Sequence, residues 1–185
     1  MLDRDGVINQ DSDTYIKSPE EWIPIPGSLD AIGRLSHAGY RVIVATNQSG
    51  IARELFDIET LNRIHQKMHH MVHEAGGIIE AVFFCPDLDD SNPWRKPNPG
   101  MLEAIGERLR IPMKNVPCVG DAMRDVVAAR AVNARPMLVK SGKGQQELNN
   151  GRDALHDVPV FEDLAAVADA LLATSDTQSN GTPHG

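Results

Sequence analysis

The chain has 185 residues, of which 41% are hydrophobic and 24% charged, and its formal net charge is -8. This size and composition are typical of one soluble globular domain. The negative charge disfavours a general nucleic-acid-binding protein, because neutralising phosphates requires a basic face. No apolar run approaches the roughly 20 residues of a membrane-spanning helix, and no signal segment precedes the acidic start, so we expect a cytoplasmic protein with no membrane contact.

The first stretch sets two carboxylates, Asp3 and Asp5, directly before Gly6. If Leu2 ends a strand, alternation points Asp3 and Asp5 the same way and Arg4 elsewhere. Gly6 then lets the backbone turn away. Two carboxylates at a strand end suit Mg²⁺, which prefers oxygen ligands. An Asp-x-Asp pair at a turn is also a common solvated loop, so this interpretation depends on the stretches that follow.

The segments after this start predict alternating helices and strands. Residues 10–26, interrupted by prolines, are expected to form a loop or flap over the Asp pair. Ser28 is expected to cap a helix over 29–38, and Asp57 the helix that follows the first strand. The expected strands are 41–45, 79–84, 116–119, 137–139 and 158–161, and the further helices are 58–75, 101–109, 123–132 and 162–173. We expect one domain over 1–173 and a disordered polar tail over 174–185.

This alternation predicts an α/β fold: a three-layer, Rossmann-like parallel sheet with helices on both faces and a minimal cap. Right-handed crossovers bring the carboxyl ends of all strands to one edge of the sheet. Polar clusters follow these ends in four places: Asp3 with Asp5, Thr46 with Asn47, Arg95 with Lys96, and Asp121 with Asp125. Ligands bind at this edge in open α/β sheets, so the coincidence indicates an active site.

These side chains offer the chemistry of phosphoryl transfer. Asp3, Asp121 and a backbone carbonyl near Asp5 can form an oxygen cage for Mg²⁺, with Asp125 as a further candidate ligand. Phosphate monoesters are very slow to hydrolyse, and a carboxylate nucleophile divides the reaction by forming an acyl-phosphate. We predict Asp3 as nucleophile and Asp5 as general acid and base. Lys96 would offset phosphoryl charge, and Thr46 would orient the group.

Four ordered motifs, at residues 3–7, 45–50, 95–101 and 119–125, resemble those of the haloacid dehalogenase (HAD) superfamily. Within this superfamily, the residues of the four motifs are similar to those of the heptose bisphosphate phosphatases of lipopolysaccharide-core precursor synthesis. The resemblance covers the chain to about Ala173. It implies a Mg²⁺-dependent phosphatase that removes a C7 phosphate through an aspartyl-phosphate, with Asp3, Asp121 and the Asp5 carbonyl as metal ligands and Arg95 in substrate recognition.

The spacing of the motifs leaves no room for a separate cap domain, so loops must set the substrate specificity. The expected substrate-binding residues are Asp11, Tyr15, Asn47, Gln48, Ser49, Arg53 and Arg95, and Arg124 and Lys143 are further candidates. The expected partner is a phosphorylated sugar, and a monomer is expected. Histidinol phosphate or another small phosphomonoester remains an alternative substrate, and a non-catalytic module of the same fold remains an alternative role.

The chain departs from the family pattern in two places. Family members usually carry a zinc loop, but Asp87 stands where a histidine is expected, and Pro93 and Trp94 stand in place of the later cysteines. The single thiolate of Cys85 cannot form a tetrahedral zinc site, so zinc is not expected, and prolines and Trp94 packing should hold the loop. Only Met1 and Leu2 precede the Asp pair, so we expect either an upstream natural start or a weakened central strand.

His65, His69 and His73 recur every four residues on one predicted helix. Such a row can bind a transition metal. We favour the simpler interpretation, a solvated and partly basic helix face.

Overall fold

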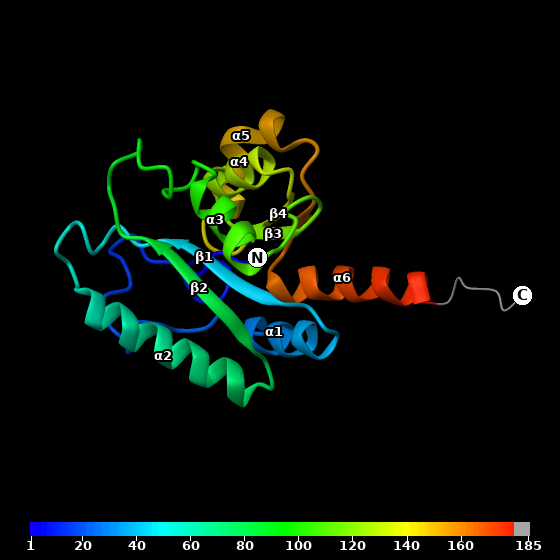
Figure 1. Cartoon of the computed structure of the whole chain (residues 1–185), viewed down its shortest axis with the longest axis horizontal. Coiled ribbons are helices and arrows are strands. Elements are labelled where there is room, and N and C mark those ends of the chain that lie inside the picture. The colour runs from blue at the N-terminus through cyan, green and yellow to red at the C-terminus, as the bar shows by residue number, and fades with distance from the viewer. Residues whose placement is uncertain (180–185) are drawn as a thin grey trace, which may run out of the picture.

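The computed structural model describes residues 1–179 of the chain. The elements, labelled in Figure 1, are α1 (Ser28–His37), β1 (Val42–Asn47), α2 (Ile58–Glu74), β2 (Ile79–Cys85), α3 (Gly100–Leu109), β3 (Pro117–Gly120), α4 (Met123–Ala131), β4 (Arg135–Val139), α5 (Gly144–Gly151), the 3₁₀ helix η1 (Arg152–Leu155), β5 (Val160–Phe161) and α6 (Leu164–Ser179). This alternation confirms the predicted α/β class. In the described part of the chain, no helix has the length and hydropathy needed to span a membrane.

The first three residues join two groups of parallel strands into one sheet. β1 pairs with β2 on one side, and β3 pairs with β4 and β4 with β5 on the other. Leu2 forms parallel bridges to Val44 of β1 and to Val119 of β3, which gives the spatial order β2, β1, residues 1–3, β3, β4, β5. The Leu2 amide donates to Ile43 O and the Asp3 amide to Val119 O, both at 2.9 Å. Asp3 therefore leaves the centre of the sheet at its carboxyl edge.

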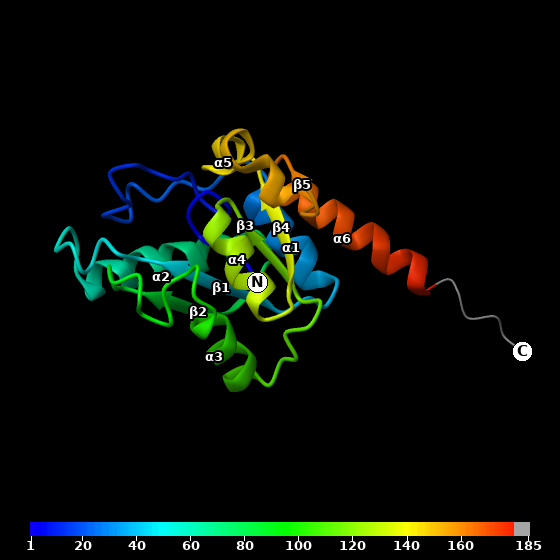
Figure 2. The same cartoon turned by 90° about the horizontal axis from the view of Figure 1, so that it is seen from above.

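Helices cover both faces of this sheet (Figure 1). Val42 and Val44 pack toward α1, α2 and α6, whereas Ile43 and Ala45 pack toward α3 and α4. All four β1 side chains are buried, which is expected for a strand inside a parallel sheet. Seen from above, α6 runs past α1 and extends away from the sheet (Figure 2).

Three helices differ from the prediction. Ser28 is the first residue of α1 rather than its cap, because Gly27 adopts a φ of 82° and the Ser28 hydroxyl instead donates to Ile8 O at 2.7 Å. Helix α5 was not predicted, since a glycine stands at each end and amide side chains dominate between them. Helix α6 continues to Ser179, so the predicted disordered tail is wrong for 174–179. The rest of that predicted tail lies outside the described residues.

The predicted flap is a hairpin-like excursion between the Asp pair and α1. Asn9 forms an antiparallel bridge with Pro24, and the Gln10 amide donates to Ile23 O at 2.9 Å. Trp22 is fully buried and anchors the far part of the flap in the core. The outer turn of the flap is thereby held over the carboxyl edge of the sheet.

Candidate active site

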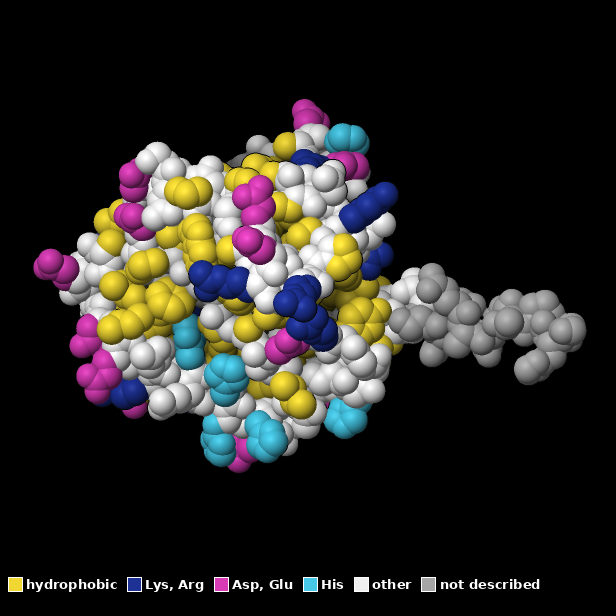
Figure 3. Space-filling model, in the orientation of Figure 1, with side chains coloured by type: hydrophobic (Ala, Val, Ile, Leu, Met, Phe, Trp, Pro, Cys, Tyr) yellow, Lys and Arg dark blue, Asp and Glu magenta, His cyan; other side chains and the backbone are white. Residues whose placement is uncertain are grey.

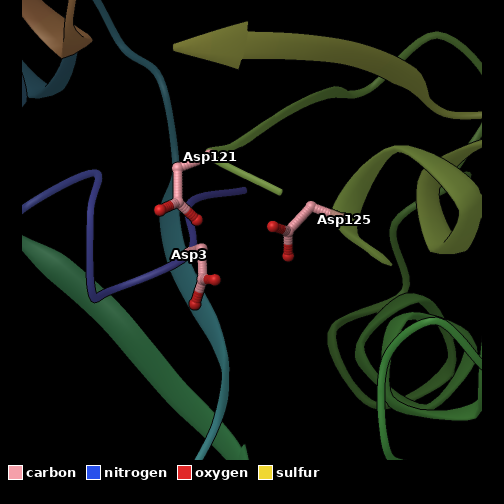
Figure 4. A group of neighbouring side chains, drawn as sticks. All are labelled: Asp3, Asp121 and Asp125. Atoms are coloured by element: carbon pink, nitrogen blue, oxygen red, sulfur yellow. The ribbon is translucent and has the colours of Figure 1, made fainter. Parts of the chain in front are cut away.

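Three carboxylates converge at the carboxyl edge of the sheet (Figure 4). Asp3 comes from the central segment, Asp121 follows β3, and Asp125 lies in the first turn of α4. One carboxylate oxygen from each residue lies within 4.8 Å of the other two. All three residues are buried, with exposed fractions of 4%, 0% and 7%. Buried acids at this separation repel one another unless cations lie between them.

Lys96 supplies one such cation. Its Nζ lies 3.1 Å from Asp3 Oδ2 and 2.5 Å from Asp125 Oδ1, and it donates to Ala45 O at 2.7 Å. Burial opposes the charge of this ammonium group, but the carboxylates of Asp125 and Asp3 outweigh it and raise the pKa of Lys96. Burial likewise opposes the charge of Asp3, but Lys96 and Arg124 outweigh it and lower the pKa of that carboxyl. Asp3 is therefore held ionised beneath the cleft.

Asp121, unlike Asp3 and Asp125, forms no ion pair with Lys96. Burial, together with the charges of Asp3 and Asp125, raises the pKa of Asp121 to about 7. Its Oδ2 accepts a hydrogen bond from the Lys143 amide at 2.8 Å, whereas its Oδ1 is buried with no hydrogen-bond partner among the described residues. An unsatisfied buried carboxylate oxygen close to Asp3 is a position where a cation can bind. The donor set fits Mg²⁺, a hard ion that prefers carboxylate and carbonyl oxygens.

Two glycines close around the same Asp121 oxygen. A Cβ at Gly6 would lie 2.1 Å from Asp121 Oδ2, and a Cβ at Gly142 would lie 2.2 Å from it. Both glycines have positive φ angles, 78° and 63°, which other residues rarely adopt. The close approach of both backbones to Asp121 thus requires glycine at each position.

Asp5 lies outside the acid cluster and is held by neutral and cationic donors. Its Oδ1 accepts from Arg4 Nε at 3.0 Å and from Asn9 Nδ2 at 2.8 Å. Its Oδ2 accepts from Arg4 Nη2 and from Gln48 Nε2, both at 2.9 Å. Asp3 and Asp5 both line the cleft and Arg4 does not, as the alternation predicts, but the fully buried Arg4 guanidinium also binds the Asp5 carboxylate with two nitrogens, which was not predicted.

The end of β1 is tied to the neighbouring motifs. Gln48 Nε2 donates to Thr46 Oγ1 at 3.0 Å as well as to Asp5, so one amide connects two of the four predicted catalytic side chains. Asn47 forms a reciprocal pair with the Lys96 backbone, donating to its carbonyl at 2.9 Å and accepting from its amide at 3.1 Å. These bonds fix the loop that delivers Lys96 to Asp3.

A cleft of about 230 Å³ opens above Asp3. Every predicted substrate-binding residue lines it: Asp11, Tyr15, Asn47, Gln48, Ser49, Arg53 and Arg95. Asp5, Thr46, Arg124 and Lys143 line it too, and so do Ser12, Asp13 and Ile16 of the flap, which sequence reasoning did not single out. A larger groove of about 960 Å³ near Met113 and Arg135 contains none of the predicted site residues.

The rim of the cleft carries several cations with partners in adjacent loops. Lys143 Nζ lies 3.3 Å from Asp11 Oδ2, which connects the flap to the loop after β4. The Arg53 guanidinium lies 5.8 Å from the centre of the Tyr15 ring. Arg95 Nε donates to the Asp90 carboxylate at 2.9 Å. The rim therefore carries arginine and lysine side chains, two of them paired with carboxylates, above an acidic floor, an arrangement suited to an anionic ligand bound with a cation.

The loop between β2 and α3 is organised by the carboxylate of Asp87, the residue that stands where the family pattern has a zinc-binding histidine. Asp87 Oδ1 accepts from the amides of Leu88 and Asp89 at 2.7 and 3.1 Å, and its Oδ2 accepts from Asn92 Nδ2 at 2.9 Å. Trp94 packs against Phe83 as predicted, with ring centres 6.4 Å apart. The Asp-rich sequence of this loop, which favours such side-chain to backbone turns, was the available signal.

The histidine row on α2 is not one uniform face. His69 and His73 are exposed, and Figure 3 shows histidine side chains gathered on the surface in the region of α2. His65 is only 8% exposed, so the prediction of a solvated face is wrong for this residue. Burial and the charge of Arg4 lower the pKa of His65 to about 3, and the imidazole is neutral.

The fold and the site define a class of protein, the HAD-like phosphatases, which have a Rossmann-like parallel sheet. A family model described as HAD-hydrolase-like matches residues 93–167. The chain is 51% identical over 173 residues to D-glycero-beta-D-manno-heptose-1,7-bisphosphate 7-phosphatases of Bordetella bronchiseptica and Pseudomonas aeruginosa, covering 93% of this chain and 96% of each relative.

A solved structure shows the same similarity in three dimensions. The D,D-heptose 1,7-bisphosphate phosphatase of B. bronchiseptica, complexed with magnesium and phosphate, superposes with a TM-score of 0.90 at 51% identity, covering 94% of this chain and 97% of that one. The phosphatase of Burkholderia thailandensis gives a TM-score of 0.71 at 44% identity, covering 93% and 96%. The chain belongs to the D-glycero-D-manno-heptose-1,7-bisphosphate 7-phosphatase family of HAD-like hydrolases, which confirms the resemblance of its motifs.

Proposed function

We propose that this protein is a Mg²⁺-dependent phosphatase that removes the C7 phosphate of D-glycero-D-manno-heptose 1,7-bisphosphate in lipopolysaccharide-core precursor synthesis. The observation that carries the proposal is the convergence of Asp3, Asp121 and Lys96 beneath a cleft whose lining includes arginine and lysine side chains. Relatives 51% identical to the chain carry this name, and one of them was solved with magnesium and phosphate.

Asp3, Asp121 and the backbone carbonyl of Asp5 would hold the metal. When bound, Mg²⁺ supplies positive charge that offsets the charge of the phosphoryl oxygens and of the acid cluster. The buried, unpaired Oδ1 of Asp121 supports this assignment. Asp125 is bound to Lys96 at 2.5 Å, so we assign it to positioning that lysine rather than to the metal.

Asp3 acts as the nucleophile. In the first step a carboxylate oxygen of Asp3 forms a bond to phosphorus while the bond from phosphorus to the sugar oxygen breaks, and Asp5 gives its proton to that oxygen. In the second step Asp5 takes a proton from water, and the water oxygen forms a bond to phosphorus as the bond to Asp3 breaks. Inorganic phosphate and free Asp3 result, and Asp5 carries the proton for the next cycle.

Lys96 and Thr46 complete the machinery around the phosphoryl group. The ammonium of Lys96, fixed beside Asp3, offsets the negative charge that spreads over the phosphoryl oxygens. The Thr46 hydroxyl, which accepts a hydrogen bond from Gln48, can donate its own hydrogen to one of these oxygens. Both groups are buried, so water does not screen them.

The rim would bind the rest of the substrate. A bisphosphate carries a second phosphate, and Arg53, Arg95 and Lys143 provide cations along the cleft that can meet it. Asp11, Tyr15, Asn47, Gln48 and Ser49 line the same cleft and offer hydrogen bonds to sugar hydroxyls. We further propose that residues 1–173 act as one domain and that the protein is a monomer, which light scattering after gel filtration would test.

A substrate panel tests the proposal. Wild-type protein with Mg²⁺ should hydrolyse heptose 1,7-bisphosphate faster than histidinol phosphate, and both substrates should be inert with Asp3→Asn. Asp153→Asn, which removes an exposed carboxylate far along the chain, serves as the matched control and should keep wild-type rates. A preference for histidinol phosphate would favour that alternative substrate, and no Mg²⁺-stimulated hydrolysis at all would favour a non-catalytic module.

A further inference from the structure

A buried line of polar groups runs from α2 to the predicted acid and base of the reaction. Arg4 has no exposed surface and lies between the Asp5 carboxylate and His65. Its Nε and Nη2 bind the two oxygens of Asp5 at 3.0 and 2.9 Å, and its Nη1 lies 3.3 Å from His65 Nε2. None of these Arg4 contacts was foreseen from the sequence.

The chemistry of the contacts fixes the role of each group. A guanidinium has only donors, so His65 Nε2 must accept from Arg4 Nη1, and the hydrogen of the neutral ring is on Nδ1. Two parallel bonds from a planar guanidinium fix the plane of a carboxylate as well as its distance. Lysine cannot reproduce this arrangement, because its ammonium is a single point with no rigid fork.

The position of Asp5 makes this orientation important. Its carboxylate lines the cleft and has a side-chain exposure of 20%, so a ligand in the cleft can reach it while both of its oxygens are bound to Arg4. Gln48 and Asn9 contribute one further hydrogen bond each. A proton transfer requires the carboxyl oxygen within about 3 Å of the atom it serves, so a small rotation of Asp5 would be costly.

From this geometry we infer that Arg4 is the positioning residue of the general acid and base, and that His65 on α2 holds Arg4 in place for that task. The inference rests on the proposed function, since it assigns Asp5 the two proton transfers of that reaction. His65 lies behind Asp5 and acts only through the guanidinium.

The choice of leaving group separates this role from a merely structural one. A sugar alkoxide needs a proton as its bond to phosphorus breaks, whereas p-nitrophenolate is stable enough to leave without one. The ratio kcat/KM reports steps up to formation of the aspartyl-phosphate, so a misplaced Asp5 lowers kcat/KM for the sugar phosphate and spares it for the aryl phosphate. Damage to the whole site would lower both values alike.

The experiment uses full-length Arg4→Lys, His65→Leu and His65→Gln with Mg²⁺. We expect Arg4→Lys to lower kcat/KM for heptose bisphosphate by roughly 10²-fold, the low end for a proton-transfer catalyst, and to change that for p-nitrophenyl phosphate by less than about threefold. His65→Leu should show the same selective loss, smaller in size, and His65→Gln should restore most of it because glutamine keeps an acceptor. His69→Leu, on the same helix but exposed, is the matched control and should behave as wild type.

Equal losses on both substrates, or wild-type values for all three variants, would overturn the inference. Thermal melting of each variant shows whether it is folded, and if Arg4→Lys is not, the contrast between His65→Leu and His65→Gln decides the question. Failure of the proposed function is a different result: wild-type protein itself would then not hydrolyse the sugar phosphate.

Discussion

Replacing Asp121 with asparagine should change how the stability of the metal-free protein depends on pH. The pKa of Asp121 is raised from 3.8 to about 7 by burial and by Asp3 and Asp125. Between these two values the folded protein holds a proton that the unfolded chain has lost, so this carboxyl makes the free energy of unfolding fall as pH rises. A shift of about three pKa units corresponds to about 4 kcal/mol, a large share of a typical total of roughly 5–15 kcal/mol.

His65 acts in the opposite direction over part of this range. Its pKa is lowered from 6.5 to about 3, so between these values the unfolded chain binds the extra proton and stability rises with pH. The two effects offset each other in the wild-type protein between about pH 4 and pH 6.5. The difference between wild type and Asp121→Asn removes the His65 contribution, because both proteins contain it.

The measurement is urea denaturation of both proteins in EDTA at pH 4 and at pH 8. Asp121→Asn should gain stability relative to wild type by up to about 4 kcal/mol between the two pH values. Addition of Mg²⁺ at 100 times its Kd should stabilise wild type by about 2.7 kcal/mol and the variant by much less. A wild-type minus variant difference that stays the same at both pH values would refute the account of Asp121 as a buried acid with a raised pKa.

Three further predictions concern other parts of the chain. Lys96→Met should abolish phosphatase activity and lower the free energy of unfolding by about 3–5 kcal/mol, because it leaves Asp3 and Asp125 buried without their cation. Adding Asp125→Asn to this variant should recover part of the stability but no activity. Asp87→Ala should speed amide hydrogen exchange in the loop after β2, because the three hydrogen bonds that its carboxylate accepts there are lost. Metal analysis of purified wild type should find no stoichiometric zinc. Equal exchange, or bound zinc, would contradict our view of the loop. Four or five β-branched residues added before Leu2 should raise the melting temperature by extending the strand between β1 and β3, and an unchanged value would mean that the added residues do not pair there.

The sequence was most informative where a polar motif follows an apolar run. Thr46 and Asp121 each follow such a run, and Asp3 follows the two apolar residues Met1 and Leu2; the topology of a parallel sheet is enough to bring these strand ends together. Lys96 was predictable for a different reason, as part of an ordered set of motifs. The contacts that connect these groups were not predictable, because they depend on the course of loops rather than on the period of a strand.

Arg4 illustrates this limit. The alternation argument holds only while the backbone stays extended, but the Arg4 carbonyl already accepts from the amides of Val7, Ile8 and Asn9 in a tight turn. Alternation predicts that Arg4 lies away from the cleft, but it does not predict the contacts with Asp5 and His65. The prediction of one solvated histidine face was wrong for His65 for a geometric reason. Four residues advance a helix by about 40° beyond a full turn, so His73 lies about 80° around α2 from His65. The row begins at the buried stripe and ends in solvent.

The paired glycines against Asp121 have a consequence for how enzymes of this shape diversify. Gly6 and Gly142 are separated by most of the chain, yet each forbids any side chain at its position for the same reason, contact with one oxygen atom. In a library of single substitutions selected for folding, both positions should tolerate nothing else, whereas rim positions such as Arg53 should accept many residues and change only substrate binding. Evolutionary changes in substrate specificity would then arise only at the rim of the cleft, while the residues beneath the cleft stay constant.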